Sequence, residues 1–236
     1  MDKNQKEQIY GKMEQLCNPY YLPKGFARDK KIMAYEKDGL LIKLGASSEH
    51  FDSINIQPGF RIGNDSINKI LKKVFPQWIG HYTSKRTQGS NFAHEFGVTE
   101  FDNSQFNFVG EGGLKYSTYS YSIEEDADLT PIIEDHINFM EKVGFKYFEA
   151  LSSVKGINEY FNSRLLNLNK EDFSSEEVRR SFQKEEILSA IVAAHLEKDK
   201  RYNEIVERYK KLYSEVELYL QDIEKLTEYI ASCINQ

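Results

Sequence analysis

The spacing of apolar side chains changes once along the chain, near residue 125. Before that point apolar and polar residues alternate, as in the stretch 53–62, and after it apolar residues recur at every third or fourth position, as in 154–168. Period two is typical of strands with one buried face, and a period near 3.6 is typical of amphipathic helices. We therefore predict an α+β fold. A mainly antiparallel sheet of about six strands with two helices should occupy residues 1–125, and an all-helical half should occupy residues 128–236.

The first half is expected to contain a helix, three strands, a second helix and three further strands. The helices are predicted over residues 2–17 and 67–74, and the strands over residues 32–36, 40–44, 53–62, 92–98, 106–109 and 115–123. Asn18-Pro19 should end the first helix, because proline disfavours a helical conformation in the residue before it. Asp38-Gly39 predicts a tight hairpin turn, because glycine tolerates the positive φ that such turns need. Asn64-Asp65-Ser66 offers side-chain oxygens for the N-cap of the second helix. An αβββ duplication is a hypothesis about this order alone, since no residue identities repeat.

The second half is expected to form about four helices that pack on the sheet. Thr130-Pro131 is typical of a helix start, and Gly144 is typical of the position just after a helix end. A heptad pattern predicts one long amphipathic helix over about 200–234, because the apolar residues from Ile205 to Cys233 alternate spacings of four and three. The apolar stripe is wider than a two-stranded seam, which favours packing within the chain. A homodimer through this helix is the alternative.

Charge and cysteine content limit the classes of partner. The formal net charge is -6 and the pI is about 5.5, so no overall positive field is available to hold a nucleic acid. Cys17 and Cys233 match neither a metal site nor a disulfide framework, as expected in a reducing compartment. The polar first residues lack the apolar core of a signal peptide, and no apolar run is long enough to span a bilayer. We expect a cytoplasmic protein without a membrane segment, metal site or cofactor.

Seven residues of the first half are candidates for a binding site: His81, Lys85, Arg86, His94, Glu111, Tyr119 and Tyr121. The first three lie in a polar stretch with the composition of a binding loop. The glycine-rich turn around Glu111 leads into a strand rather than a helix, unlike a phosphate-binding loop. No two histidines have the spacing of a zinc site. These residues are therefore candidates for binding, and no catalytic residue is assigned.

A short basic segment near the N-terminus is a candidate of a different kind. Its basic side chains and the neighbouring aromatic residues are Lys24, Arg28, Lys30, Lys31, Tyr20, Tyr21 and Phe26. Basic groups beside aromatic rings can hold a single-stranded nucleic acid. The segment is short, Asp29 interrupts it, and the whole chain is acidic, so nucleic-acid binding is the less favoured interpretation.

Two short motifs carry a resemblance to known proteins. Gly25-Phe26 follows the first predicted helix, and the third predicted strand contains Ile54-Asn55-Ile56-Gln57. In these features, over about residues 5–75, the chain resembles a bacterial family of unknown function whose members open with a helix, a Gly-Phe pair and an antiparallel sheet. The resemblance implies a bacterial cytosolic protein of immunity or accessory type that binds a protein partner. It implies no catalytic residues.

Three functions of different classes are compatible with these observations. The first is a non-enzymatic protein-binding protein, whose partner contacts the open face of the sheet or its aromatic and acidic surface. The second is a small hydrolase or transferase with a pocket between sheet and helices, using His81, His94 or Glu111. The third is a nucleic-acid-associated protein that uses residues 24–31. A cleft with convergent histidines and carboxylates would favour the enzyme, and an exposed patch of tyrosine and phenylalanine would favour the binding protein.

Overall fold

The chain forms two compact units. The structure is a computed structural model, and it describes residues 3–29, 33–50, 53–76, 92–95, 121–123, 128–180, 182 and 184–234. Unit 1 consists of Met1–Arg61 and Ala93–Phe148, and unit 2 consists of Ile62–Phe92 and Glu149–Gln236. Residues 128–148 therefore belong with the strands, although the change in apolar spacing near residue 125 groups them with the later helices.

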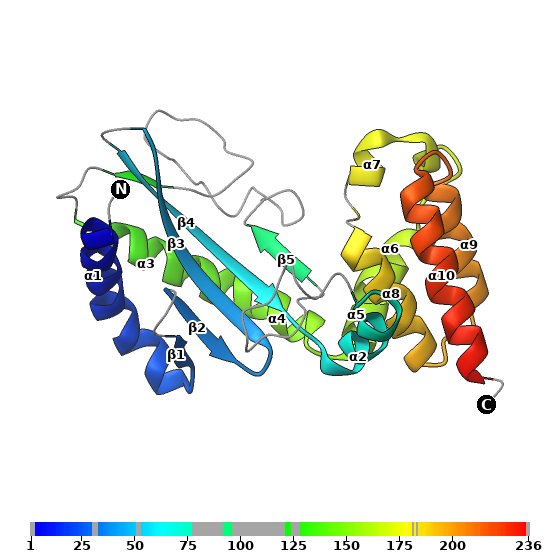
Figure 1. The fold of residues 1–236 in the computed structure, drawn as a ribbon, viewed down its shortest axis with the longest axis horizontal. Helices are drawn as coiled ribbons and strands as arrows, with labels where there is room; N and C mark the ends of the chain where they lie inside the picture. Colours follow the sequence, from blue (N-terminus) through cyan, green and yellow to red (C-terminus); the bar gives the residue numbers. More distant parts are fainter. Residues whose placement is uncertain are drawn as a thin grey trace. The chain divides into compact units, whose positions relative to one another are not determined.

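Antiparallel strands form one layer of unit 1 (Figure 1). The strands are β1 (Ala27–Asp29), β2 (Ala34–Lys37), β3 (Leu40–His50), β4 (Ser53–Ile62), β5 (Phe92–Glu95) and β6 (Tyr121–Ile123). In the ladder of β1, β2 and β3, Arg28 pairs with Tyr35 and Tyr35 pairs with Ile42. The strand order is β1-β2-β3-β4-β5, and β6 pairs antiparallel with β4. Leu40, Ile42 and Leu44 on one face of β3 are buried, and Leu41 on the opposite face is buried as well, so the start of this strand is covered on both faces.

The predicted hairpin turn at Asp38-Gly39 is confirmed. Both residues adopt a positive φ, 49° for Asp38 and 84° for Gly39. Lys37 and Leu40 face each other across the turn as the last and first residues of β2 and β3. Two central residues with positive φ match the right-handed twist of the flanking strands, which explains why Asp-Gly is favoured here. The turn fixes the backbone of Lys37 and Asp38 at one end of the ladder.

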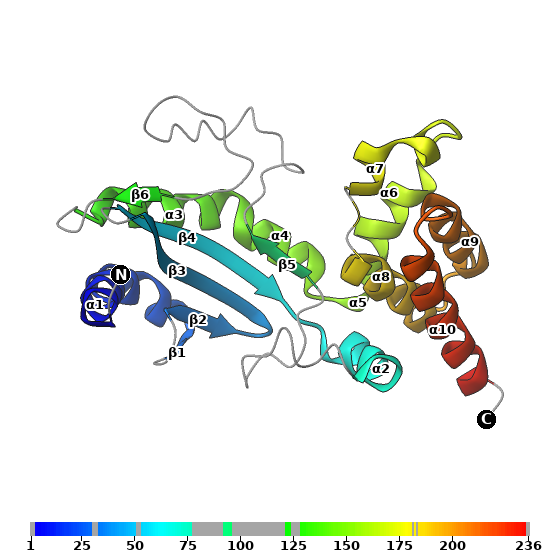
Figure 2. The same cartoon turned by 45° about the horizontal axis from the view of Figure 1, so that its top comes forward.

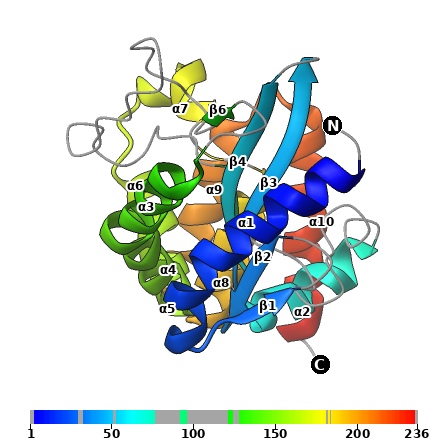
Figure 3. The ribbon, with the colours of Figure 1, turned by 90° about the vertical axis from the view of Figure 1, so that its left-hand side faces the viewer.

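Helix α1 (Lys3–Tyr21) is longer than predicted, because it continues past Pro19 to Tyr21 and into the short 3-10 turn η1 (Leu22–Lys24). The predicted end at Asn18-Pro19 is therefore wrong. Ile9, Met13, Cys17 and Tyr21 are buried at intervals of four residues, so the face that packs on the core extends through the proline. Figure 3 shows α1 lying across the strands, and it contacts both β3 and α3 (Thr130–Phe139).

Contacts among four side chains anchor the end of α1 in the core of unit 1. The Tyr21 hydroxyl and His136 Nε2, both buried, are hydrogen-bonded at 2.8 Å. The Tyr21 ring also stacks on Tyr35 of β2, with the centroids 4.6 Å apart, and the Tyr35 hydroxyl donates to Asn18 Oδ1 at 2.8 Å. Burial lowers the pKa of His136 to about 3, so its imidazole is neutral at physiological pH. This cluster joins α1, α3 and β2.

The helix that begins at Thr130 does not end at Gly144 as predicted. It passes through the π-helical turn η4 (Met140–Gly144) and continues as α4 (Phe145–Leu151). Gly144 serves close packing rather than helix termination, because a Cβ there would lie 2.6 Å from Met140 Cε and Sδ. A π-helical turn contains an additional residue, so Phe145 and Phe148 take the positions that residues 144 and 147 would hold on an uninterrupted α-helix.

Unit 2 consists of helices that surround one buried helix. Its elements are α2 (Asp65–Val74), α5 (Val154–Ile157), η5 (Asn158–Asn162), α6 (Ser163–Leu166), η6 (Asp172–Ser174), α7 (Glu176–Arg180), α8 (Lys184–Leu196), α9 (Tyr202–Leu212) and α10 (Glu217–Ile234). Residues 186–194 of α8 are all buried, and α8 contacts α2, α5, η5, α9 and α10. Figure 2 shows α8, α9 and α10 side by side. A helix that is covered all round in this way carries apolar residues on every face.

The predicted helix over about 200–234 is two helices, α9 and α10, separated by residues 213–216. Tyr213 is buried at the break, and its hydroxyl lies within hydrogen-bond distance of two carbonyl oxygens, those of Arg179 at 2.7 Å and Phe182 at 2.5 Å, between which its single proton is shared. This anchor holds the residue outside the helical register that the heptad pattern predicts. The apolar stripe is nevertheless buried within unit 2, at Ile205, Tyr209, Leu212, Ile223, Leu226 and Ile230.

The predicted fold class is wrong in its balance of helix and sheet. The described residues are mostly helical, whereas the prediction gave about half of the chain to a six-stranded sheet. The antiparallel sheet is a ladder of three strands, β1, β2 and β3, and β4, β5 and β6 add only short pairings to it. The predicted strand 106–109 lies outside the described residues. Apolar alternation alone does not determine which segments pair, because strand preference depends on tertiary context. An α+β combination of helices and an antiparallel sheet is what remains of the prediction.

The αβββ duplication stays a prediction, because most residues of the last three predicted strands lie outside the described residues. In the described part of the chain four strands, β1 to β4, precede α2 in place of the three predicted, and α2 belongs to unit 2. Its predicted N-cap is present, because Asn64 Oδ1 accepts a hydrogen bond from the backbone N–H of Ile67 at 3.2 Å. None of the helices in the described part of the chain combines the length and the apolar character needed to cross a bilayer.

We predict that unit 1 loses stability on mild acidification through His136. Its pKa is about 3 in the folded chain against 6.5 as the ordinary value, so below pH 6.5 the unfolded chain binds a proton that the folded chain excludes. The free energy of unfolding should therefore fall as pH decreases, by about 2 kcal/mol between pH 7 and pH 5. Urea denaturation, followed by circular dichroism, gives the free energy of unfolding of the native protein and of His136→Gln at each pH. The difference between the two free energies should become smaller as the pH decreases from 7 to 5. An identical pH dependence for both would contradict the prediction.

Candidate functional site

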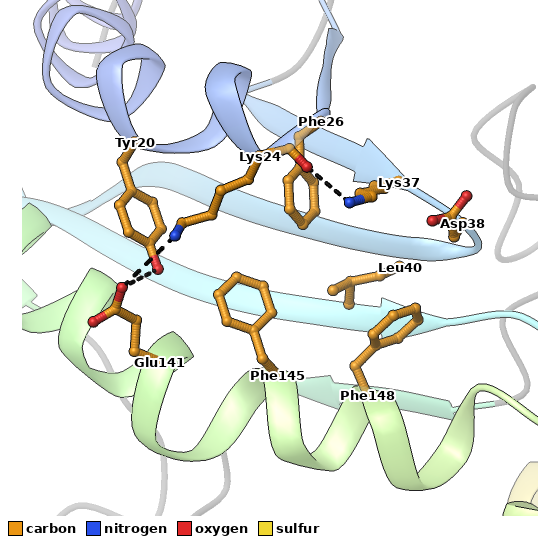
Figure 4. Close-up of a pocket in the computed structure, with 9 residues that line it drawn as sticks. All are labelled: Tyr20, Lys24, Phe26, Lys37, Asp38, Leu40, Glu141, Phe145 and Phe148. Carbon is orange, nitrogen blue, oxygen red and sulfur yellow. Dashed lines mark hydrogen bonds and ion pairs between the residues drawn. The ribbon is translucent and has the colours of Figure 1, made fainter.

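A pocket of about 520 Å³ lies within unit 1, between the end of α1, the β2–β3 hairpin and the η4–α4 helix (Figure 4). Its lining residues are Tyr20, Lys24, Phe26, Lys37, Asp38, Leu40, Glu141, Phe145 and Phe148. They come from three regions that are distant in sequence. The features already described bring them together: the extension of α1 past Pro19, the tight turn at Asp38-Gly39 and the π-helical turn η4.

The inner surface of the pocket is apolar and aromatic. Phe26 and Leu40 are buried, with exposed fractions of 7% and 0%, and Phe145 and Phe148 are half-buried. The ring centroids of Phe26 and Phe145 lie 6.1 Å apart. In Figure 4 the side chains of Phe26, Leu40, Phe145 and Phe148 all face the same space. Such a surface can receive an apolar group and shield it from water.

At one end of the rim three polar side chains interact with one another. The Tyr20 hydroxyl donates to Glu141 Oε1 at 2.9 Å, and Lys24 Nζ lies 3.9 Å from the same oxygen. The Lys24 ammonium also lies over the Tyr20 ring, 4.6 Å from its centroid. Partial burial and the hydrogen bond to Glu141 raise the pKa of the Tyr20 phenol above its usual value. The phenol is therefore protonated at neutral pH and acts as a hydrogen-bond donor.

The other end of the rim is formed by Lys37 and Asp38. Lys37 Nζ donates to the backbone carbonyl of Lys24 at 2.8 Å and lies 5.8 Å from the centroid of the Phe26 ring. Gly25, with a φ of 84°, lies beneath this ammonium, because a Cβ there would be 3.7 Å from Lys37 Nζ. Figure 4 shows the Lys37 ammonium directed toward Lys24 and the Asp38 carboxylate directed elsewhere.

The seven candidates from the sequence do not form this pocket in the part of the chain that the structure describes. His81, Lys85, Arg86, Glu111 and Tyr119 lie outside the described residues. His94 lies in β5 and Tyr121 in β6, at the strand positions expected from their alternation. Their role in binding stays a prediction.

The basic segment near the N-terminus was the sequence signal that came closest to the pocket. It contains Tyr20, Lys24 and Phe26, which line the pocket. Arg28 is directed elsewhere, since its guanidinium lies 3.6 Å from Glu14 and 5.7 Å from the centroid of the Tyr35 ring. Lys30 and Lys31 lie outside the described residues, so nucleic-acid binding by this segment stays a prediction.

The residues on the helical side of the pocket were not among the candidates predicted from the sequence. Glu141, Phe145 and Phe148 lie more than a hundred residues from Lys24 in the chain, and no local motif marks them. Their spacing of four and three predicts one helix face. The spacing does not predict which part of the chain packs against this helix face.

A second polar cluster lies in unit 2 and has a structural role. Asn162 Nδ2 donates to Asn158 Oδ1 at 2.7 Å and to the carbonyl of Ala190 at 2.9 Å, and Asn158 Nδ2 donates to Asp199 Oδ2 at 3.0 Å. The side chain of Arg201 donates to Asp199 and holds the pKa of that carboxyl well below its usual range. The cluster ties η5 and α8 to the start of α9. Within the described ranges, no three histidine, cysteine or acidic side chains gather as a metal site would require.

Comparison with known proteins adds no relative to this description. No family model matches the sequence, and neither the curated proteins nor the solved structures contain a match. The resemblance over residues 5–75 therefore stays a prediction, and the pocket has to be interpreted from its own chemistry.

We predict that Gly144→Ala disturbs the pocket and destabilises unit 1. The new Cβ would lie 2.6 Å from the thioether at the flexible end of the Met140 side chain. Met140 is fully buried, so this end must move within a packed core, at a cost of about 1 kcal/mol. Chemical denaturation measures the loss, and NMR should show shifts in the amide signals of Phe145 and Phe148.

Gly11→Ala is the matched control, because a Cβ at Gly11 would meet nothing within 4 Å. In the middle of α1 this change should stabilise the protein, by about 0.5–1 kcal/mol. Equal effects of the two substitutions would contradict the packing role assigned to Gly144.

Proposed function

We propose that this chain is a non-enzymatic protein-binding protein, and that the pocket of unit 1 receives an apolar side chain of its partner. The observation that carries the proposal is the pocket itself, which joins an aromatic inner surface to a charged rim. Protein interfaces obtain most of their affinity from a few apolar or aromatic anchors that enter such pockets, while polar groups around the rim set orientation.

The partial exposure of the aromatic side chains in the pocket supports a role in binding. Phe145 and Phe148 are only half-buried, although they lie beside the buried Phe26 and Leu40. Each ring can therefore bury additional surface against a partner, and apolar surface removed from water contributes roughly 25 cal/mol per Å² before the costs of association. The cluster is also pre-formed, because Phe26 contacts both Phe145 and the core residue Tyr21.

The chemistry of the rim gives less support to a hydrolase or transferase. Among the described lining residues there is no histidine, cysteine, serine or threonine that could pair a nucleophile with a base. Among the residues that line the pocket, Tyr20 has a shifted pKa, and the shift is upward. The shift keeps the phenol protonated and therefore weakens it as an acid or nucleophile near neutral pH.

We predict that removing one ring of the pocket weakens partner binding at least about tenfold, the loss expected for truncating an aromatic anchor. The probe is a phage-displayed random peptide library selected on the native protein. The dissociation constants of the enriched peptides are then measured by isothermal titration calorimetry for the native protein and for Phe148→Ala. Circular dichroism establishes that the variant is folded.

Leu218→Ala is the control, because Leu218 is an exposed apolar residue of α10 in unit 2, with 60% of its surface accessible. Peptides that bind the native protein and Leu218→Ala equally, but bind Phe148→Ala weakly, support the proposal. A selection that enriches no peptide, or peptides that bind Phe148→Ala as tightly as the native protein, would contradict it.

A further inference from the structure

The two lysines at the rim of the pocket differ in how their charges are satisfied. Lys24 lies 3.9 Å from Glu141 Oε1 and over the Tyr20 ring. Glu141 accepts from Tyr20 as well, at 2.9 Å. One carboxylate, one phenol and one ammonium therefore satisfy one another at this end of the pocket.

Lys37 has no such counter-ion among the residues that the structure describes. The partners found for its ammonium are a backbone carbonyl, that of Lys24 at 2.8 Å, and the face of the Phe26 ring at 5.8 Å. Neither carries a negative charge, and the neighbouring Asp38 carboxylate is directed away from it (Figure 4). An ammonium group has three donors, so donors remain for a ligand.

A tight turn and one hydrogen bond orient this ammonium. Lys37 is the last residue before the tight turn at Asp38-Gly39, which fixes its backbone, and the bond to the Lys24 carbonyl holds the end of its side chain. Gly25 leaves room for it, because the nearest atom to a Cβ at that position would be Lys37 Nζ, at 3.7 Å. A cation held in place beside an apolar surface loses little side-chain freedom when an anion binds.

We infer that the partner segment carries a carboxylate next to its apolar side chain, and that Lys37 binds this carboxylate while the apolar group enters among Phe26, Phe145 and Phe148. The inference rests on the proposed function and adds the chemical class of the partner: an acidic segment with an apolar or aromatic anchor. Charge complementarity at Lys37 carries it. Of the two lysines and two carboxylates of the rim, Lys24 and Glu141 pair with each other, the Asp38 carboxylate is directed away, and the Lys37 ammonium lies by the Phe26 ring without a carboxylate partner among the described residues. A singly charged carboxylate suits a single ammonium, whereas phosphate groups are more often held by arginine clusters.

The test compares three blocked peptides in a glycine–serine background, which contain phenylalanine–aspartate, phenylalanine–asparagine or alanine–aspartate at their centre. Each is titrated into the ¹⁵N-labelled full chain, and the dissociation constant is taken from amide chemical shifts. We expect the phenylalanine–aspartate peptide to bind about fivefold more tightly than its asparagine counterpart, because a partly exposed ion pair contributes on that order. The advantage should shrink in 0.5 M salt, because salt screens exposed charges.

Two lysine variants test whether Lys37 causes the preference for aspartate over asparagine. Lys37→Met keeps the aliphatic stem and removes the charge, so it should abolish the preference for aspartate over asparagine. Lys43→Met is the matched control, since Lys43 is an exposed lysine of the neighbouring strand β3 that does not line the pocket, and this variant should retain the preference. A preference that persists in Lys37→Met would overturn the assignment to Lys37.

The outcomes also separate this inference from the proposed function. If the two phenylalanine peptides bind equally and the alanine peptide binds weakly, the inference that Lys37 binds a carboxylate is wrong. The proposal that the pocket receives an apolar side chain would still hold. If neither phenylalanine peptide binds more tightly than the alanine peptide, the proposed function fails together with the inference.

Discussion

A buried hydrogen bond between Tyr21 and His136 is the interaction on which the rest of unit 1 depends. It joins the last residue of α1 to the middle of α3, and the ring of Tyr21 stacks on Tyr35 of β2. Because both polar groups are buried, each satisfies the other at a place where an unpaired group would be costly. The helix consequently continues past Pro19, and the residue before Tyr21 is directed to the pocket instead of the core.

Glycine and the π-helical turn position the opposite wall of the pocket. At Gly144 the absence of a Cβ lets the Met140 side chain pack closely, and the additional residue of η4 shifts the face of the helix that follows. Phe145 and Phe148 thereby come to lie with Glu141 around one space. Two local departures from regular helix geometry, one at the end of α1 and one in η4, therefore produce the aromatic surface and the charged rim of the same pocket.

Local sequence signals predicted local structure, and the errors arise where distant residues decide. The turn at Asp38-Gly39 and the cap at Asn64 depend on adjacent residues and were predicted correctly. The end of α1 and the break before α10 were predicted wrongly, because they depend on contacts of Tyr21 and Tyr213 with segments far away in the chain. The size of the sheet was also wrong, since alternation does not specify pairing. The candidate site was predicted in part: the sequence marked Lys24 and its neighbouring aromatic residues as a group of basic and aromatic side chains, but contained no signal that the helical face 141–148 would complete the pocket.

A double-mutant cycle on Tyr21 and His136 tests the central claim most directly. The free energies of unfolding of the native protein, Tyr21→Phe, His136→Leu and the double variant are measured by urea denaturation at pH 7. If the buried hydrogen bond joins α1 to α3, the two substitutions should be coupled by about 1 kcal/mol or more, because each single change leaves a buried polar group without its partner. A coupling energy within about 0.3 kcal/mol of zero would mean that the two side chains act independently, and would contradict the account.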